Sequence, residues 1–324
     1  MPPVEPFWPR VSPHFLACRR AVRAHADAVR AHTGAVRSNT DTARSAVIGL
    51  SGGPDSLALV AAAAAEGCDM RAVVVDHGLQ EGSASVAEQA RAAAETLGVT
   101  ATIVRVEVET APGESVEAAA REARYQALFA EAEADGSDVW VAHTLDDQAE
   151  TLLLGALRGN PAGMSPVTET ASGRLVRPFL QVRRADTAGA CDELGLQPWH
   201  DPMNDDTAYR RVAVRRSIIP ALGDLIGGDA AAPLAKTAER IAADNALIDE
   251  AYDLSPTNDC AELAADPAPI RQRRIRAWLR TYGVELGGGQ VGSVDRLCVE
   301  WRGQGPVDVA GARVGRANGR LYVE

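Results

Sequence analysis

Lysine is nearly absent from the sequence. Of the 33 basic residues among 324, Lys236 is the one lysine and the others are arginine. The glycine-rich loop at residues 51–56 does not end in Lys-Ser or Lys-Thr, so it is not a Walker A loop. No lysine lies near this loop in the sequence, so any side-chain cation that binds phosphate there is expected to be an arginine.

Paired cysteines and long apolar runs are also missing. The five cysteines are odd in number and widely spaced, with no C-x-x-C, which argues against a disulfide framework or a zinc site and fits a reducing cytosol. No stretch of 18 apolar residues occurs, and residues 1–20 lack the continuous apolar core of a signal peptide. We therefore expect a cytoplasmic protein with no membrane segment.

An excess of positive charge is absent as well. The formal net charge is −11, which argues against a protein that coats nucleic acid by bulk electrostatics. Arginines nevertheless cluster at residues 210–216 and 271–276, where local phosphate contacts are expected. The alternative is a packing domain with a solvated arginine-rich face.

The chain is long enough for two domains, and its 46% hydrophobic content supports sizeable cores. From residue 44, short apolar runs alternate with helical patterns, which predicts a parallel sheet covered on both faces by helices, an α/β fold. A helix over residues 15–36 precedes it, with His14, His25 and His32 expected to be solvated. The expected strands are 46–50, 71–76, 100–106 and 138–142, and the expected helices are 55–66, 83–97, 114–135 and 145–157.

The most informative stretch follows the first predicted strand. Val47 to Leu50 leads into Ser51, Gly52, Gly53, Pro54, Asp55 and Ser56, after which a helix is expected with proline at its first position. Glycines let the backbone turn tightly, so that N–H groups and the new helix N-terminus converge on an anion, most plausibly a phosphate. The competing interpretation is an ordinary turn in which glycine serves geometry alone.

Polar residues follow the neighbouring strands. In a doubly wound sheet the carboxyl ends of the strands meet around a ligand, so these residues are expected to converge with the loop. Asp146 and Glu150, four residues apart, would place two carboxylates on one helix face, for Mg²⁺ or an amine. Thr144 and Asp147 could instead form a simple helix cap, and Arg121 a surface ion pair. The polar sets are Asp76 with His77, Arg121 with Arg124, and His143 through Glu150.

Taken in order, these motifs resemble the tRNA(Ile)-lysidine synthetase family of PP-loop N-type ATP pyrophosphatases. The resemblance runs from about Val47 to Leu222 and includes the blocks at 51–56, 75–79, 120–125, 143–151, 158–164, 177–180, 199–204 and 209–222. Two positions depart from the family pattern: Thr144 stands where a second histidine is common, and Val212 where an asparagine is common.

The resemblance implies an adenine-nucleotide α-hydrolase-like (PP-loop) fold and a ligase. ATP would adenylate O2 of cytidine 34 in the CAU anticodon of tRNA(Ile), and the ε-amine of L-lysine would then displace AMP. The implied cofactors are ATP and Mg²⁺. The implied site residues are Ser51, Gly52, Gly53, Asp55, Ser56, Asp76 and His77 for ATP, Asp55 and Asp146 for Mg²⁺, Asp147 and Glu150 for lysine, Asp55, His143, Asp147 and Glu150 for catalysis, and Arg121, Arg124, Arg158, Arg211, Arg215 and Arg274 for phosphate or tRNA.

Four segments are predicted. They are an N-terminal helical extension at 1–43, the catalytic PP-loop domain at 44–222, a linker at 223–232 and a smaller C-terminal α+β domain at 233–324 that contacts tRNA, with helices at 234–254 and 270–282 and short antiparallel strands near its end. A homodimer is a further expected assembly. Two alternatives stay open: another PP-loop tRNA-modifying ligase, such as a 2-thiocytidine synthetase or an amidotransferase, and a nucleotide-binding module without catalysis. The missing paired cysteines and glutaminase domain weigh against the first, and Asp55, Asp147 and Glu150 against the second.

Overall fold

The fold was analysed in a computed structural model of the chain. It describes residues 8–33, 45–80, 82–108, 110 and 115–324, with the backbone alone for 27–33. The chain divides into two compact units. The sheet unit comprises Met1–Glu150 and Met164–Ala235, and the C-terminal unit comprises Thr151–Gly163 and Lys236–Glu324.

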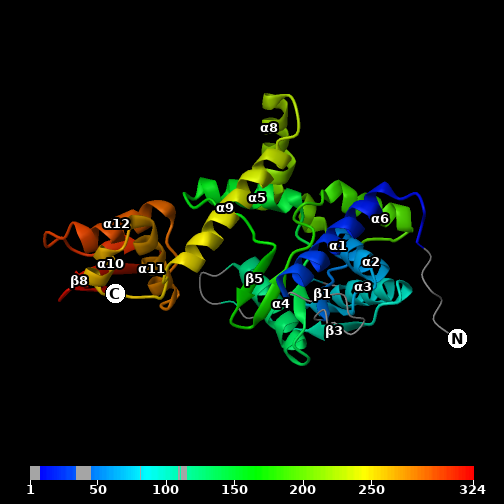
Figure 1. Cartoon of the computed structure of the whole chain (residues 1–324), viewed down its shortest axis with the longest axis horizontal. Coiled ribbons are helices and arrows are strands. Elements are labelled where there is room, and N and C mark those ends of the chain that lie inside the picture. The colour runs from blue at the N-terminus through cyan, green and yellow to red at the C-terminus, as the bar shows by residue number, and fades with distance from the viewer. Residues whose placement is uncertain (1–7, 34–44, 81, 109, 111–114) are drawn as a thin grey trace. The chain divides into compact units, whose positions relative to one another are not determined.

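The sheet unit is built on a six-stranded sheet in the order β3-β2-β1-β4-β6-β5 (Figure 1). All neighbours are parallel except the β5–β6 hairpin. Because β1 lies between β2 and β4, the chain reverses its direction across the sheet there, which is the switch point where α/β sheets bind ligands. The strands are β1 (Ala46–Gly49), β2 (Met70–Asp76), β3 (Ala101–Arg105), β4 (Asp138–Trp140), β5 (Val167–Thr170) and β6 (Gly173–Val176).

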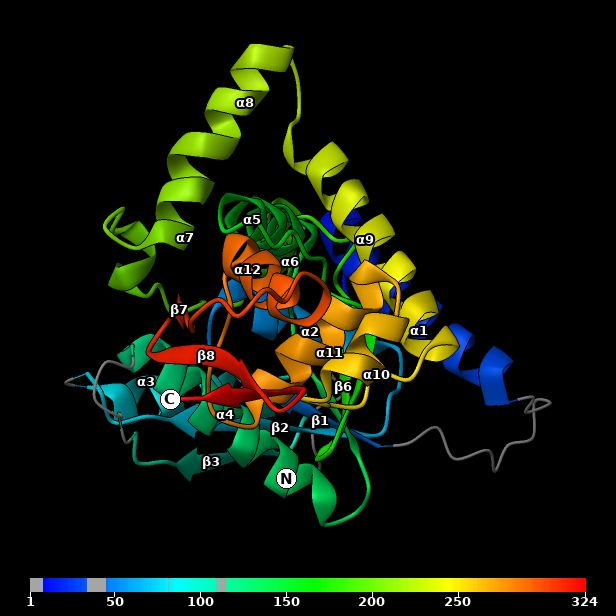
Figure 2. The same cartoon turned by 90° about the vertical axis from the view of Figure 1, so that its left-hand side faces the viewer.

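Helices cover both faces of this sheet, as the alternation of the sequence predicts. Ile48 points into a core shared with four helices on one face, whereas Val47 packs on the other face against Leu128 of α4. Figure 2 labels β3, β2, β1 and β6 in this order across the sheet, and β4 lies between the last two. The helices of the first face are α1 (Pro13–Thr33), α2 (Pro54–Ala65), α3 (Ser83–Thr96) and α6 (Arg184–Leu194), and α4 (Val116–Glu133) lies on the second.

The N-terminal helix is more closely packed than the sequence suggests. His14 bonds Asp186 through Nδ1 at 2.9 Å, and the ring of His25 lies edge-on to Trp140, with 5.2 Å between ring centroids. Burial lowers the pKa of His25 to about 4. The expectation of solvated histidines is therefore wrong for His25, while the side chain of His32 lies outside the described residues.

Three further helices follow α6 in the sequence. They are α7 (Arg210–Ala213), α8 (Ile219–Ile226) and α9 (Ala231–Ala251), with a π-helix at Val214–Ile218 between the first two. Of these, α7 and α8 belong to the sheet unit and α9 begins in it. The predicted linker at 223–232 thus includes the end of α8 and the start of α9. The four predicted segments, with boundaries after residues 43, 222 and 232, remain a prediction. No single helix of the described residues is long and apolar enough to cross a membrane, although the bent pair Arg210–Ile226 and Ala231–Ala251 passes on length and composition together.

The C-terminal unit is an α+β domain with its own core. The antiparallel strands β7 (Val307–Val309), β8 (Ala312–Ala317) and β9 (Arg320–Val323) pack with α12 (Gly288–Val299), α11 (Ala268–Arg280) and α10 (Cys260–Ala265) around Ile275, Leu279 and Leu297. The segment Thr151–Gly163 belongs to this unit. A Cβ on Gly163 would lie 1.9 Å from the carbonyl oxygen of Ala238, so this close approach requires glycine.

Candidate active site

The loop after β1 is a turn built for an anion. Gly52 has φ +81°, a conformation that L side chains rarely adopt, and Gly53 caps the N-terminus of α2, which begins at Pro54. The buried hydroxyl of Ser56 donates to the Gly53 carbonyl oxygen at 3.0 Å and accepts from the Ser51 amide at 3.2 Å. These bonds fix the loop while the helix N-terminus faces outward, as a phosphate site requires.

Asp55 stands in the first turn of α2 with one partner on each side of its carboxylate. The Thr187 hydroxyl of α6 donates to Oδ1, and the Arg184 guanidinium lies 3.7 Å from Oδ2. Burial raises the pKa of Asp55 to about 6, because the hydrogen bond and the cation only partly offset desolvation. The carboxyl group therefore exchanges its proton close to neutral pH.

Asp147 caps the helix α5 (Leu145–Leu157), as the alternative interpretation of the sequence proposes. Its Oδ2 accepts from the Thr144 amide at 2.8 Å and from the Thr144 hydroxyl at 2.7 Å, and the Asp147 amide in turn bonds the hydroxyl at 3.3 Å. Its Oδ1 accepts from Arg184 at 2.8 Å and from Arg211 at 3.1 Å. Burial opposes the charge, but the two guanidinium groups and the Thr144 bonds lower the pKa of Asp147 to about 2.

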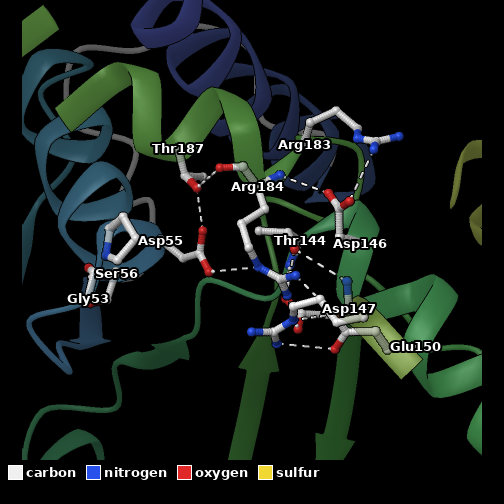
Figure 3. Close-up of polar contacts among 12 residues, drawn as sticks. Gly53, Asp55, Ser56, Thr144, Asp146, Asp147, Glu150, Arg183, Arg184 and Thr187 are labelled. Atoms are coloured by element: carbon white, nitrogen blue, oxygen red, sulfur yellow. Dashed lines mark hydrogen bonds and ion pairs between the residues drawn. The ribbon is translucent and has the colours of Figure 1, made fainter. Parts of the chain in front are cut away.

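Glu150, one helical turn later, has no exposed side-chain surface and is surrounded by three arginines (Figure 3). Arg184 and Arg215 donate to Oε1 at 2.9 and 2.8 Å, and Arg211 donates to Oε2 at 2.8 Å. Burial favours the neutral acid, yet these cations lower the pKa of Glu150. Figure 3 shows Arg184 reaching from α6 between Asp55 on one side and Asp147 and Glu150 on the other, so a single guanidinium joins all three carboxylates.

The two predicted histidines follow β2 and β4, and each has a buried Nδ1 atom without a hydrogen-bond partner. Burial is the main cause that lowers the pKa of His77, and it lowers the pKa of His143 to about 3. Both rings are therefore neutral near pH 7, and His143 is a weak base in this state. Asp76 is buried, and its carboxylate accepts from the Gly78 amide at 3.0 Å, which fixes the turn after β2.

Asp146, the second predicted metal ligand, already has protein partners. Its carboxylate accepts from the Arg184 amide at 2.8 Å and pairs with the Arg183 guanidinium at 3.1 Å, so both of its oxygens already have partners. Among the described residues, no group of three or more His, Cys, Asp or Glu side chains could hold a metal ion. Asp55 remains the one predicted ligand whose carboxylate stands beside the phosphate loop.

Comparison with known proteins decides the family. A model of the PP-loop domain matches residues 26–222, and a model of the TilS substrate binding domain matches residues 259–322. A curated tRNA(Ile)-lysidine synthase from Corynebacterium glutamicum is 46% identical over 324 residues, covering 97% of this chain and 93% of the relative. The chain belongs to the tRNA(Ile)-lysidine synthase family. The corresponding synthase of Corynebacterium diphtheriae is also 46% identical, with 98% of this chain and 99% of the relative covered.

The fold extends beyond the tRNA(Ile)-lysidine synthase family. A U34-tRNA thiolase from Methanococcus maripaludis, solved with its [4Fe-4S] cluster, aligns with a TM-score of 0.54 at 15% identity, covering 74% of this chain and 83% of that one. At this identity the likeness concerns the fold alone, and it agrees with the predicted PP-loop architecture.

The other predicted arginines differ in their surroundings. In the sheet unit, Arg121 and Arg124 lie over the Tyr125 ring at 5.0 and 5.7 Å, and Arg121 is exposed. In the C-terminal unit, Arg158 is exposed, but Arg274 is buried and pairs with both Glu262 and Asp266. The prediction that Arg274 binds phosphate is not supported, because its guanidinium is already neutralised inside the domain.

Two residues of this site escaped the sequence analysis of the tRNA(Ile)-lysidine synthase motifs: Arg184 and Thr187. Both lie on α6, between the motif blocks at 177–180 and 199–204 and outside either of them. A signal was present, because α6 begins at Arg184 directly after Arg183, and cations are unfavourable at a helix N-terminus. An arginine pair in that position indicates carboxylates nearby in space, here Asp146, Asp147 and Glu150.

Proposed function

We propose that this chain uses ATP to join L-lysine to C2 of cytidine 34 in the CAU anticodon of tRNA(Ile), giving lysidine, AMP and pyrophosphate. The observation that carries the proposal is the carboxylate cluster of Asp55, Asp147 and Glu150 beside the phosphate loop, in a chain of the tRNA(Ile)-lysidine synthase family. Phosphate binding and amine binding are the two tasks that this ligation requires.

Each half of the reaction has residues suited to it. In the first half the cytidine O2 attacks the α-phosphorus and pyrophosphate leaves, with the phosphates held by the amides of the loop and the N-terminus of α2. Four arginines are proposed as cations for the phosphates of ATP or tRNA. Arg211 and Arg215 bond Glu150, and Arg121 and Arg124 belong to α4. Asp76 and His77, at the carboxyl end of the neighbouring strand β2, are proposed to contact the same ATP.

In the second half the ε-amine of lysine attacks C2 of the adenylated base and AMP leaves with O2. The amine is protonated at neutral pH, since its ordinary pKa is about 10.4, so it needs carboxylates that bind it and a group that accepts its proton. Asp147 and Glu150 carry the charge for the first task. His143 or one of the same two carboxylates would accept the proton, since Asp55 is the residue proposed to hold Mg²⁺.

Magnesium enters the proposal with ATP. Protein sites for Mg²⁺ paired with phosphates commonly use one or two carboxylates and leave the other positions to phosphate oxygens and water. Asp55, in the first turn of α2 after the phosphate loop, suits such a role better than Asp146, which pairs with Arg183. When bound, the ion would neutralise charge on the phosphates during pyrophosphate release.

The cellular setting and assembly are part of the same proposal. A cytoplasmic site agrees with a tRNA substrate and with the five cysteines, all within the described ranges, which form no disulfide. The proposal of a homodimer follows the expectation stated for the sequence. The residues Ile218, Leu225 and Ile226, in and next to α8, leave apolar surface that a second copy could cover.

A single assay tests the function. The purified chain is incubated with ATP, Mg²⁺, radiolabelled lysine and bacterial tRNA, and then with a tRNA(Ile) variant whose anticodon lacks C34. Label in the first tRNA and none in the second is expected, together with pyrophosphate release. Absence of both label and pyrophosphate would favour a nucleotide-binding module, and incorporation that ignores C34 would favour another PP-loop ligase.

A further inference from the structure

Arginines already occupy the carboxylates of Asp147 and Glu150, which are proposed to bind the ε-amine of lysine and are called the amine pocket below. Asp147 uses Oδ2 for Thr144 and Oδ1 for Arg184 and Arg211. Glu150 uses Oε1 for Arg184 and Arg215 and Oε2 for Arg211 and Arg215, and it has no exposed surface. Every carboxylate oxygen that is predicted to receive the lysine ammonium therefore has two protein donors, which fills its two lone pairs.

A lysine ammonium bound to these carboxylates must therefore displace a guanidinium. Arg184 contacts both of them and also stands 3.7 Å from Asp55, next to the phosphate loop. It is the arginine that reaches the amine pocket and the loop with one side chain. Its own helix begins at Arg184, so the side chain can turn from one place to the other without movement of a strand or of the helix interior.

The charge of ATP provides the force for that turn. A triphosphate placed on the loop adds several negative charges at the end of the site where Asp55 lies, and guanidinium groups bind phosphate oxygens in a bidentate manner. Arg184 can exchange two carboxylates for the phosphates without losing its charge-assisted bonds. Asp147 Oδ1 and Glu150 Oε1 would then each lose one of two donors and present one free lone pair, while Arg211 and Arg215 keep their bonds to these oxygens.

We propose that Arg184 is a positioning residue that fills the amine pocket until ATP is bound, so that ATP must bind before lysine. The inference rests on the proposed function, because it concerns the same lysine pocket. It adds an order of binding that is set by affinity: lysine binds only weakly to a site that lacks the nucleotide with which it must react. By linkage, lysine must in turn raise the affinity for ATP by the same factor.

The test measures lysine binding by calorimetry without tRNA, in the presence and absence of α,β-methylene-ATP, whose α–β bridge is not cleaved. In the unaltered protein we expect the nucleotide to strengthen lysine binding by about tenfold or more, within the usual range of coupling between sites. In Arg184→Met the pocket is open without nucleotide, and the ratio of the two affinities should fall close to one. Arg184→Lys retains a cation and should retain most of the ratio.

Arg183→Met is the matched control, because Arg183 is the adjacent residue and pairs with Asp146 and Asp229 outside the amine pocket. It should keep the ratio of the unaltered protein. If Arg184→Met does not fold, the reciprocal measurement decides the matter: the affinity of the unaltered protein for the nucleotide must rise with lysine by the same factor.

Equal lysine affinity with and without nucleotide in the unaltered protein, or an undiminished ratio in Arg184→Met, would overturn the inference. Neither result would touch the proposed function if the same preparation still incorporates lysine into tRNA. Failure of that incorporation refutes the function itself, whatever the order of binding.

Discussion

Replacement of Glu150 by glutamine is the sharpest perturbation of the site. Glutamine keeps the size of the side chain but removes the charge that three arginines share. Removing one partner of a buried ion pair costs about 3–5 kcal/mol, because the remaining charge is left uncompensated. The side chains of the three arginines are 23%, 33% and 27% exposed, so water offsets part of this loss and the lower end, about 3 kcal/mol, is expected.

Thermal unfolding measures this effect directly. For a domain of roughly 150–250 residues, 1 kcal/mol changes the melting temperature by about 2–4 °C, so Glu150→Gln should melt about 6–12 °C lower. Glu88→Gln is the control, because Glu88 is half exposed and forms a surface pair with Arg91 on α3, which is worth less than about 1 kcal/mol. If Glu150→Gln melted within the shift of Glu88→Gln, the arginine cluster would not depend on the buried carboxylate, and the electrostatic account of the site would be refuted.

Three further predictions follow from particular residues. Asp55→Asn should abolish lysine incorporation, and full incorporation would exclude Asp55 from catalysis. The pKa of Asp55 is about 6 in the folded protein and near 4 in the unfolded chain, so between pH 4 and pH 6 the native state binds the proton and the unfolded state releases it. The carboxylate therefore lowers the free energy of unfolding as pH rises through this range, by about 3 kcal/mol at most. Asp55→Asn should match the unaltered protein near pH 4 and melt at a higher temperature than it at pH 8. Gly52→Ala should cost about 1–2 kcal/mol in a denaturant titration, since φ is +81° and the new Cβ would lie 3.2 Å from that of Ala90, and no loss would contradict the strained turn. Arg274→Met should lower stability without changing the Michaelis constant for tRNA, and a raised constant with normal stability would restore its predicted role in binding.

The sheet was predictable because its signals are local. Apolar runs and short loops determine βαβ units, and the glycines and proline at 52–54 mark the turn that follows β1. The β5–β6 hairpin was missed because its strands, Val167–Thr170 and Gly173–Val176, are short and partly polar, and β5 is the edge strand of the sheet. An edge strand has little apolar periodicity from which to predict it.

The site was predictable in its residues and not in their pairing. Asp147 and Glu150 are one turn apart on α5, and their proximity follows from helix geometry alone. That Arg184 joins them to Asp55 depends on where α6 packs, which no local pattern specifies. Arg274 illustrates the same limit, because the sequence alone does not distinguish a buried arginine that pairs with two acidic residues from a solvated arginine.

The near absence of lysine has a chemical consequence for the arginine-lined pocket. The adenylated cytidine is an electrophile that any free amine within reach could attack, including an amine of the enzyme. Arg184, Arg211 and Arg215 remain protonated at all relevant pH values and offer no lone pair for such an attack. Lys236 pairs with Glu239 on α9. The three arginines thus attract anions strongly without offering a side-chain amine that competes with the substrate.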